Sequence, residues 1–284
     1  MIIIADSGST KTEWIVGEVA DLSVITKGIN PVRDTKEEIL EVLSTELMPK
    51  LFSSSTISQA DVTEIHFYGA GCIPPFSQSV KEALGYLFPQ AEAHVYSDLL
   101  GAARALCSRE EGIACILGTG SNSCLFDGEK IIDNTPSLGY ILGDEGSGAH
   151  LGRQLISDCI KKQLPKKICD KFFEQYDLTV ATILEKTYHN TSLPNRWLAS
   201  FTPFLSEHRL VPEINTMLKQ CFKQFFQRNT MTYRRSWLPI HIIGNIGIHF
   251  SEEIKETAES LGLSIGNIVD SPINGLIEYH KQNK

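Results

Sequence analysis

The sequence predicts an α/β protein of two domains, in which each domain is a mixed sheet that opens with a β-hairpin and carries helices on both faces. Three observations predict this fold. The chain has 284 residues and is 42% hydrophobic, which is enough for two cores of moderate size. A small-residue turn after an apolar run occurs twice, around Gly8 and around Gly120. Segments with strand and helix periodicity alternate between these turns. We expect domains at 1–111, joined by a C-terminal helix at 272–284, and at 112–271.

The first turn lies in "IADSGSTKTE", residues 4–13. It is not a P-loop, because that motif needs a second glycine directly before the lysine, and Lys11 follows Thr10. Apolar and β-branched residues flank the turn, which favours a β-hairpin. The backbone N–H groups of such a turn can point at an anion. Asp6, at the end of the first strand, suits a divalent cation beside a phosphate group. The alternative is an ordinary hairpin turn.

The second turn lies in "ACILGTGSNSCLFDGE", residues 114–129. Gly120 corresponds to Gly8 and Ser121 to Ser9, and a Gly-Glu pair follows each second strand. The spacing is too long for a solenoid repeat and is typical of a domain. Two such hairpins could hold one polyphosphate from both sides, unless their likeness is a coincidence.

Strand and helix patterns alternate between the two turns. Residues 63–72 and 92–98 read as strands, and residues 76–88 and 99–110 read as helices. Ligands bind at the carboxyl ends of strands in sheets of this kind. Asp98 lies at such an end, so it is a candidate catalytic carboxylate. The alternative role for Asp98 is capping of the helix that follows, for which Ser97 is an equally good candidate.

Two later segments are rich in glycine. In "LGDEGSGAHLGR", Gly143 and its neighbours surround Asp144 and Glu145, and paired carboxylates suit sugar hydroxyls or a hydrated metal. The alternative is a mobile loop whose acids cap the next helix. The segment "GNIG", Gly244 to Gly247, follows an apolar strand and offers a flat backbone surface for a nucleoside. Ser251 is expected to cap the helix after it.

Composition excludes several classes of protein. The net charge is −8 and the pI is about 5.5, so we expect no nucleic acid and no anionic membrane as partner. No apolar run approaches the roughly 18 residues of a membrane span. The seven cysteines have no C-x-x-C spacing, which indicates buried, reduced thiols in a cytoplasmic protein without zinc or iron–sulfur. Motifs of metalloproteases, α/β-hydrolases and Rossmann enzymes are missing from the sequence.

Taken together, "DSGSTKTEW", "GINP", "YSDLLGAA", "LGTGSNS", "LGDEGSGAHLGR" and "GNIG" resemble the N-acetylglucosamine kinase and BadF/BadG/BcrA/BcrD-type ATPase family. This family belongs to the actin-like, hexokinase-like phosphotransferases, whose two ribonuclease-H-like domains enclose a nucleotide and sugar cleft. The resemblance runs from Ile2 to about Gly247, and residues 157–236 match nothing in it. It implies a kinase that uses ATP and Mg²⁺ to phosphorylate the 6-hydroxyl of an amino sugar.

The resemblance also implies roles for individual residues. Asp98 would be the catalytic base, and Asp6 would help to hold Mg²⁺. Sugar would be bound by Asn30, Asp98, Gly143, Asp144 and Glu145. ATP would be bound by two phosphate loops and an adenosine shelf, consisting of Ser7, Gly8, Ser9, Thr10, Lys11, Thr12; Gly118, Thr119, Gly120, Ser121; and Gly244, Asn245, Gly247.

N-acetylglucosamine is the first candidate for the sugar, and glucosamine, N-acetylmannosamine or a muramyl sugar are alternatives. A homodimer is compatible with the sequence. The rival function is an ATPase that couples hydrolysis to a partner enzyme, like the activators of acyl-CoA dehydratases. Those activators hold an iron–sulfur cluster between two subunits, and no cysteine pair here has suitable local spacing. A sugar sensor without catalysis fits poorly with an intact Asp98 and two phosphate loops.

Overall fold

The computed structural model describes residues 1–8, 10–17, 22–52, 58–189 and 193–281. The chain splits into two compact units. Unit 1 consists of Met1–Glu110, Asp127–Ile131 and Ser271–Lys284, and unit 2 of Glu111–Phe126 and Ile132–Asp270. The expected boundary at residues 111 and 112 between separately folding domains stays a prediction. No helix in the described ranges is both long and apolar enough to cross a membrane.

Unit 1 is a five-stranded mixed sheet in the order β3-β2-β1-β4-β5. β1 pairs antiparallel with β2 and parallel with β4, and β4 pairs parallel with β5. Its elements are β1 Ile2–Ser7, β2 Lys11–Val16, β3 Leu22–Lys27, α1 Lys36–Val42, the π-helical turn η1 Leu43–Leu47, α2 Met48–Phe52, η2 Gln59–Asp61, β4 Glu64–Gly69, α3 Ser77–Leu87, β5 Glu92–Ser97, α4 Asp98–Cys107 and α14 Ile273–Lys281.

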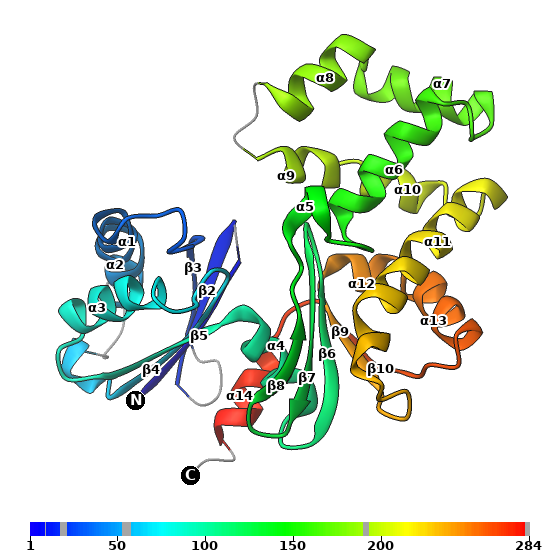
Figure 1. Ribbon diagram of the computed structural model, residues 1–284. Helices are drawn as coiled ribbons and strands as arrows, with labels where there is room; N and C mark the ends of the chain where they lie inside the picture. The colour runs from blue at the N-terminus through cyan, green and yellow to red at the C-terminus, as the bar shows by residue number, and fades with distance from the viewer. Residues whose placement is uncertain (9, 18–21, 53–57, 190–192, 282–284) are drawn as a thin grey trace. The chain divides into compact units, whose positions relative to one another are not determined.

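Helices cover both faces of this sheet (Figure 1). Strand side chains such as Trp14 and Phe67 pack on one face against Leu43 and Leu84, which belong to η1 and α3. On the other face, Ile4 and Tyr68 pack against apolar residues of α14, and α14 also contacts α4. Because successive strand residues point to opposite faces, each face has its own core.

Unit 2 repeats the same strand order. Its sheet runs β8-β7-β6-β9-β10, in which β6, β9 and β10 are parallel. Its elements are β6 Glu111–Leu117, β7 Ser121–Asp127, β8 Ile131–Thr135, α5 Gly139–Leu142, α6 Gly148–Ile160, α7 Lys166–Tyr176, α8 Val180–Tyr188, α9 Pro194–Ala199, α10 Thr202–Glu207, α11 Pro212–Arg228, η3 Thr230–Tyr233, β9 Ile240–Ile243, α12 Asn245–His249, α13 Ser251–Ser260 and β10 Ile265–Val269. The predicted pair of mixed α/β sheets is thereby confirmed.

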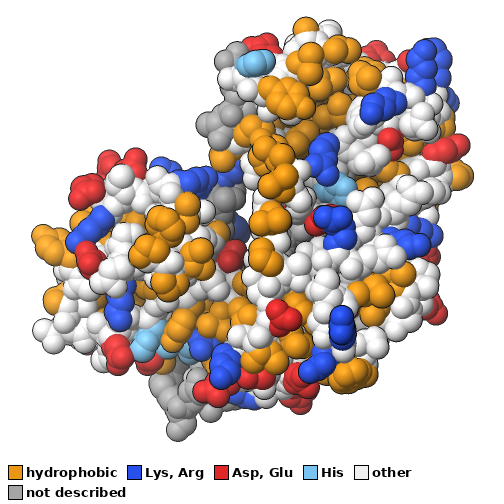
Figure 2. Space-filling view, viewed as in Figure 1, with side chains coloured by type: hydrophobic (Ala, Val, Ile, Leu, Met, Phe, Trp, Pro, Cys, Tyr) orange, Lys and Arg blue, Asp and Glu red, His pale blue; other side chains and the backbone are white. Residues whose placement is uncertain are grey.

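The described residues of the segment 157–236, which no motif explained, are mostly helical. Its inner side chains, among them Phe172, Phe204 and Phe222, are fully buried in the core of unit 2. Val180 and Tyr188 of α8 are exposed, and Figure 2 shows apolar side chains gathered over this helix.

Candidate active site

Three parallel strands of unit 1 end side by side. Ser7 is in register with Gly69, and Gly69 is in register with Ser97. Asp6 precedes the first of these ends, and Asp98 follows the third. Since ligands of α/β sheets bind at the carboxyl ends of strands, both acidic residues lie at the edge where a ligand is expected.

Asp98 is the first residue of α4, and it does not cap this helix. The cap is Ser97, whose Oγ accepts a hydrogen bond of 3.2 Å from the N–H group of Leu100. The Oδ1 atom of Asp98 accepts a bond of 2.8 Å from the N–H group of Leu99. Burial raises the pKa of Asp98 above its usual value, and the backbone hydrogen bonds oppose this effect. Capping therefore does not explain a carboxylate at position 98.

Asp6 has a strongly perturbed carboxyl group. Its pKa is raised to about 7, mainly by burial and also by the nearby carboxylates of Asp98 and Glu13, whereas Lys11 acts in the opposite direction. A cation bound beside Asp6 and Asp98 would remove the repulsion between the two carboxylates. No three His, Cys, Asp or Glu side chains in the described ranges form a metal site by themselves. Mg²⁺ bound with a nucleotide usually takes only one or two carboxylates, with phosphate oxygens and water as its other ligands, so this donor set fits Mg²⁺ with ATP.

Hydrogen bonds of buried hydroxyl groups stabilise the β1–β2 turn. The fully buried Ser7 Oγ lies 2.7 Å from Thr12 Oγ1, donates to the carbonyl of Ile29 and accepts from its N–H group. The N–H group of Gly8 donates to the carbonyl of Lys11. These groups of Ser7, Gly8 and Thr12 hold the turn and the "GINP" segment together.

The exposed part of the turn consists of other residues. The side chains of Thr10 and Lys11 are exposed, which suits contact with a ligand. Ser9, which was also predicted to bind phosphate, lies outside the described residues. The turn therefore offers an exposed hydroxyl and an exposed ammonium group above an internally bonded base.

Asn30 lies against the turn that follows β4. A Cβ atom on Gly71, which has φ of +78°, would overlap Asn30 Oδ1. The same Oδ1 atom accepts a bond of 3.1 Å from the N–H group of Val32, so the amide Nδ2 is the end of the side chain suited to donate to a ligand. Unit 1 thus places Asn30, Asp6, Asp98 and the hairpin turn around the ends of β1, β4 and β5.

The turn between β6 and β7 is fixed by the start of α6. The carbonyls of Gly118 and Thr119 accept hydrogen bonds of 2.8 and 3.1 Å from the N–H groups of Gly148 and Ala149. A Cβ atom on Gly118 would meet no heavy atom within 4 Å. One side of this turn is therefore open to a close approach by a ligand.

Asp144 lies directly against the β6–β7 turn. Its Oδ1 accepts from the N–H group of Ser121 at 3.3 Å, and a Cβ atom on Gly120 would lie 2.9 Å from its Oδ2. Burial raises the pKa of Asp144 to about 6. Its φ of +53° falls in a region that few residues other than glycine adopt. Strain of this kind is retained where the surrounding structure holds a side chain in a required position.

Glu145 is held by residues that the sequence motifs did not indicate. It is paired with Arg228, and the amide of Asn229 donates to it at 3.4 Å. Burial opposes ionisation of Glu145, but hydrogen bonds, including those from Asn229 and Arg228, lower its pKa overall. Glu145 therefore joins the glycine-rich loop to the end of α11. Gly143 has a packing role as well, because a Cβ atom there would overlap the carbonyl of Ser137.

The "GNIG" segment lies next to the β6–β7 turn. Gly244 has φ of +119°, and a Cβ atom there would overlap the carbonyl of Leu117. Asn245 is exposed at the start of α12, whereas Gly247 packs under it against Ile242. Unit 2 thus brings together the turn 118–121, Asp144 and this shelf.

The predicted cap of the helix after the shelf was wrong. Ser251 is the first residue of α13, and this helix has no side-chain cap. The chain instead inserts the short helix α12 after Gly244, so α13 continues from an existing turn of helix.

Comparisons with known proteins agree with this fold. No family model and no curated protein matches the chain. A crystal structure from Porphyromonas gingivalis named "putative N-acetylglucosamine kinase" is 43% identical, with 100% of this chain and 99% of that chain covered and a TM-score of 0.94. A protein of the same name from Chromobacterium violaceum is 16% identical, covers 98% of each chain and has a TM-score of 0.66. A ROK hexokinase from Thermus thermophilus is 10% identical, covers 100% of this chain and 99% of that chain and has a TM-score of 0.58.

The repeated sheets and these likenesses define a protein of the actin-like ATPase fold. The 43% identity to the Porphyromonas protein, over 100% of this chain, identifies one family within this class. The chain belongs to the N-acetylglucosamine kinase and BadF/BadG/BcrA/BcrD-type ATPase family.

Proposed function

We propose that this protein is an ATP-dependent sugar kinase that phosphorylates the 6-hydroxyl group of an amino sugar, with N-acetylglucosamine as the first candidate. The observation that carries the proposal is the position of Asp98. Its carboxylate lies at the strand ends beside Asp6, and Ser97 performs the capping that could otherwise have explained it. The name of the 43% identical Porphyromonas protein supports the same substrate.

Asp98 acts as the general base in this proposal. A base is most effective when its pKa lies near the working pH, and burial moves the pKa of Asp98 upward from its usual value. The carboxylate accepts the proton of the sugar hydroxyl as its oxygen attacks the γ-phosphoryl group of ATP, whose bond to the leaving ADP breaks. Asn30 and Asp144 orient other hydroxyl groups of the sugar, one as an amide donor and one as a carboxylate acceptor. Gly143 and Glu145 shape the loop that holds Asp144.

The remaining predicted residues bind the nucleotide. ATP supplies the phosphoryl group, and Mg²⁺ neutralises the charge that develops on it. Asp6 holds the metal, and the turns at 7–12 and 118–121 contact phosphate groups. Gly244, Asn245 and Gly247 lie under adenosine. We propose that each unit contributes one phosphate-binding turn, because the two sheets share one strand order and each carries a turn of the same kind.

The coupled ATPase is less well supported. An iron–sulfur cluster shared by two subunits needs accessible thiolates, but all seven cysteines are buried. Burial also raises the pKa values of Cys72 and Cys107 to about 12, which keeps these thiols protonated. We further propose a cytoplasmic location, and a homodimer remains compatible with the fold.

A panel of sugars with ATP and Mg²⁺, read by ADP release, tests the proposal. The panel contains N-acetylglucosamine, glucosamine, N-acetylmannosamine, N-acetylmuramic acid and glucose. We expect N-acetylglucosamine to give the highest kcat/KM. ADP release that no sugar stimulates would contradict the proposal and favour the coupled ATPase.

A further inference from the structure

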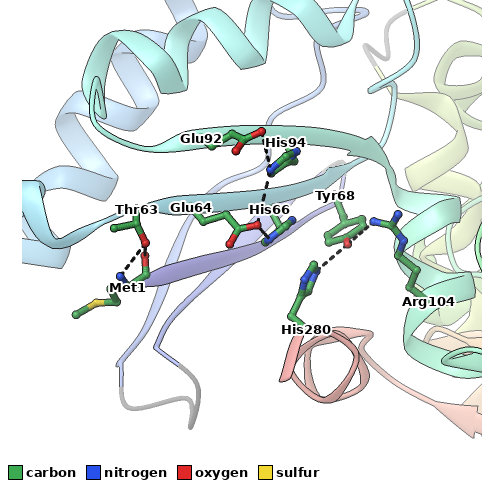
Figure 3. A network of polar contacts seen from close by, with 9 residues as sticks. All are labelled: Met1, Thr63, Glu64, His66, Tyr68, Glu92, His94, Arg104 and His280. Atoms are coloured by element: carbon green, nitrogen blue, oxygen red, sulfur yellow. Dashed lines mark hydrogen bonds and ion pairs between the residues drawn. The ribbon is translucent and has the colours of Figure 1, made fainter. Parts of the chain in front are cut away.

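Two neighbouring strands of unit 1, β4 and the edge strand β5, carry the same alternating motif, Glu-x-His-x-Tyr. It occupies residues 64–68 in β4 and 92–96 in β5. The strand register places like residues side by side, Glu64 with Glu92, His66 with His94 and Tyr68 with Tyr96. Alternate residues of a strand share one face, so the six side chains form three matched rows. Figure 3 shows five of these side chains, all except Tyr96, on the face that α4 and α14 cover.

A chain of hydrogen bonds links Arg104, Tyr68 and His280 on this face. Arg104 Nη1 donates to the hydroxyl oxygen of Tyr68 at 2.9 Å, and that hydroxyl lies 2.9 Å from His280 Nε2 (Figure 3). Burial raises the pKa of Tyr68 and lowers that of His280 to about 3. The tyrosine therefore keeps its proton, and the histidine ring is neutral. The Arg104 guanidinium, 4.4 Å from the ring centre of Tyr96, stays charged.

His66 is left with a buried acceptor. Its Nε2 lies 2.7 Å from Glu64 Oε1, so Nε2 carries the proton and donates it to the carboxylate. Burial lowers the pKa of His66 to about 4, so the ring is neutral and Nδ1 is a bare lone pair. This Nδ1 atom is buried and has no hydrogen-bond partner among the described residues, and the residue is only 7% exposed. A buried acceptor of this kind is unfavourable unless a ligand or water donates to it.

These groups line a pocket of about 290 Å³ in unit 1. Its charged and polar lining includes Glu64, His66, Tyr96, Arg104, Arg109 and Glu129, and α14 adds Tyr279 and His280. Glu129 lies in the turn between β7 and β8. This turn packs against Arg109, because a Cβ atom on the neighbouring Gly128 would overlap the Arg109 carbonyl. The pocket reaches Ile2, at the end of β1 opposite Ser7. Five residue steps of strand separate these two ends by roughly 16 Å, which distinguishes the pocket from the candidate active site.

The lining is selective for one kind of ligand. Arg104 and Arg109 supply two guanidinium groups, which match the oxygens of a phosphate group. Glu64 and Glu129 are acceptors, which match hydroxyl groups. A simple inorganic anion would use the two arginines but neither carboxylate. A polyol or sugar without charge would not use the positive charge of the arginines.

We propose that this pocket binds a small phosphate monoester that also carries hydroxyl groups, of the sugar phosphate class. The phosphate group lies toward Arg104 and Arg109, and the hydroxyl groups donate to Glu64 and Glu129. The site is separate from the proposed kinase centre and does not depend on its activity.

Glucose 6-phosphate, inorganic phosphate and glucose serve as probes of the full-length protein. Hydrogen–deuterium exchange locates the binding, and calorimetry measures its strength. We expect glucose 6-phosphate to bind more tightly than either of the others and to protect 104–110, 127–131 and 273–281 from exchange. No binding of glucose 6-phosphate would overturn the proposal. Protection confined to residues 6–12 and 118–121 would also overturn it, because the probe would then occupy only the candidate active site.

Two variants of opposite charge sharpen the test. Arg109→Gln should weaken binding of glucose 6-phosphate at least about tenfold, since one charge-assisted contact is lost. Glu129→Gln should not weaken inorganic phosphate but should reduce the advantage of glucose 6-phosphate over it. Arg209→Gln is the matched control, because Arg209 forms an ion pair with Glu252 and neither residue is among those that line the pocket. Equal affinities for wild type and a folded Arg109→Gln protein would contradict the site.

Discussion

Replacement of Asp98 by Asn separates a catalytic carboxylate from a structural one. The substitution keeps the size of the side chain and an oxygen that can accept from the N–H group of Leu99. It removes the charge that accepts a proton, and general-base catalysis contributes about 10²- to 10⁴-fold in rate. This range equals roughly 2.7–5.5 kcal/mol of transition-state stabilisation, at about 1.36 kcal/mol for each factor of ten.

The stability of the Asp98→Asn protein should not fall. The helix cap remains, because Ser97 supplies it. Burial disfavours the charged form of Asp98 in the folded state. A neutral amide at this position removes the desolvation cost of the charge and therefore does not lower the free energy of unfolding. We therefore expect an equal or higher melting temperature with a collapsed rate of sugar phosphorylation.

The neighbouring residue provides the control for this experiment. Ser97→Ala removes the Oγ that accepts from Leu100, and loss of such a cap costs about 0.5–2 kcal/mol of stability. Its rate should stay near that of the wild type at a temperature where it is folded. The assay is ADP release with saturating sugar and ATP, beside thermal unfolding of both variants. A rate within a few-fold of wild type for Asp98→Asn would refute the assignment of Asp98 as the base.

Three further predictions concern the two turns and the metal site. Gly120→Val should weaken ATP binding measured by calorimetry, because the new side chain would press on a buried carboxylate, whereas Gly85→Ala, with open space around it, should leave ATP binding unchanged. Asp6 has a folded pKa of about 7, above its unfolded value, so the folded state binds its proton more tightly and stability should fall as pH rises from about 4 to 7. Asp6→Asn should flatten this part of the profile in thermal unfolding, and an unchanged profile would contradict the shift. Ser7→Ala should destabilise the protein by about 1–3 kcal/mol, because it leaves buried polar groups of Ile29 without their partner; denaturant unfolding with no change in midpoint would argue against this role.

Much of the fold could be predicted because its signals are local. Each turn follows an apolar strand and is followed by another, so the hairpins around Gly8 and Gly120 were visible as sequence patterns. The edge that carries Asp6 and Asp98 followed from the rule that parallel strands end together. The repeated strand order of the two sheets then agrees with the duplicated turn.

Other features depend on contacts between distant residues. Arg228 holds Glu145 across 83 positions of the chain, and no pattern near either residue indicates the pair. The choice between Ser97 and Asp98 as helix cap depends on backbone angles that the residue types leave open. The left-handed conformation of Asp144 was hidden for a similar reason, because the neighbouring glycines were the expected sites of positive φ. The Glu-x-His-x-Tyr repeat was present in the sequence, but its meaning depends on the strand register.

The most direct test of the central claim is the stoichiometry of the reaction with N-acetylglucosamine. Purified protein is incubated with ATP, Mg²⁺ and the sugar, and ADP and phosphorylated sugar are counted together by ³¹P NMR. If the protein is a sugar kinase, we expect one molecule of sugar 6-phosphate for each ADP and almost no inorganic phosphate. ADP that appears with an equal amount of inorganic phosphate, whether or not sugar is present, would contradict the account and identify an ATPase instead.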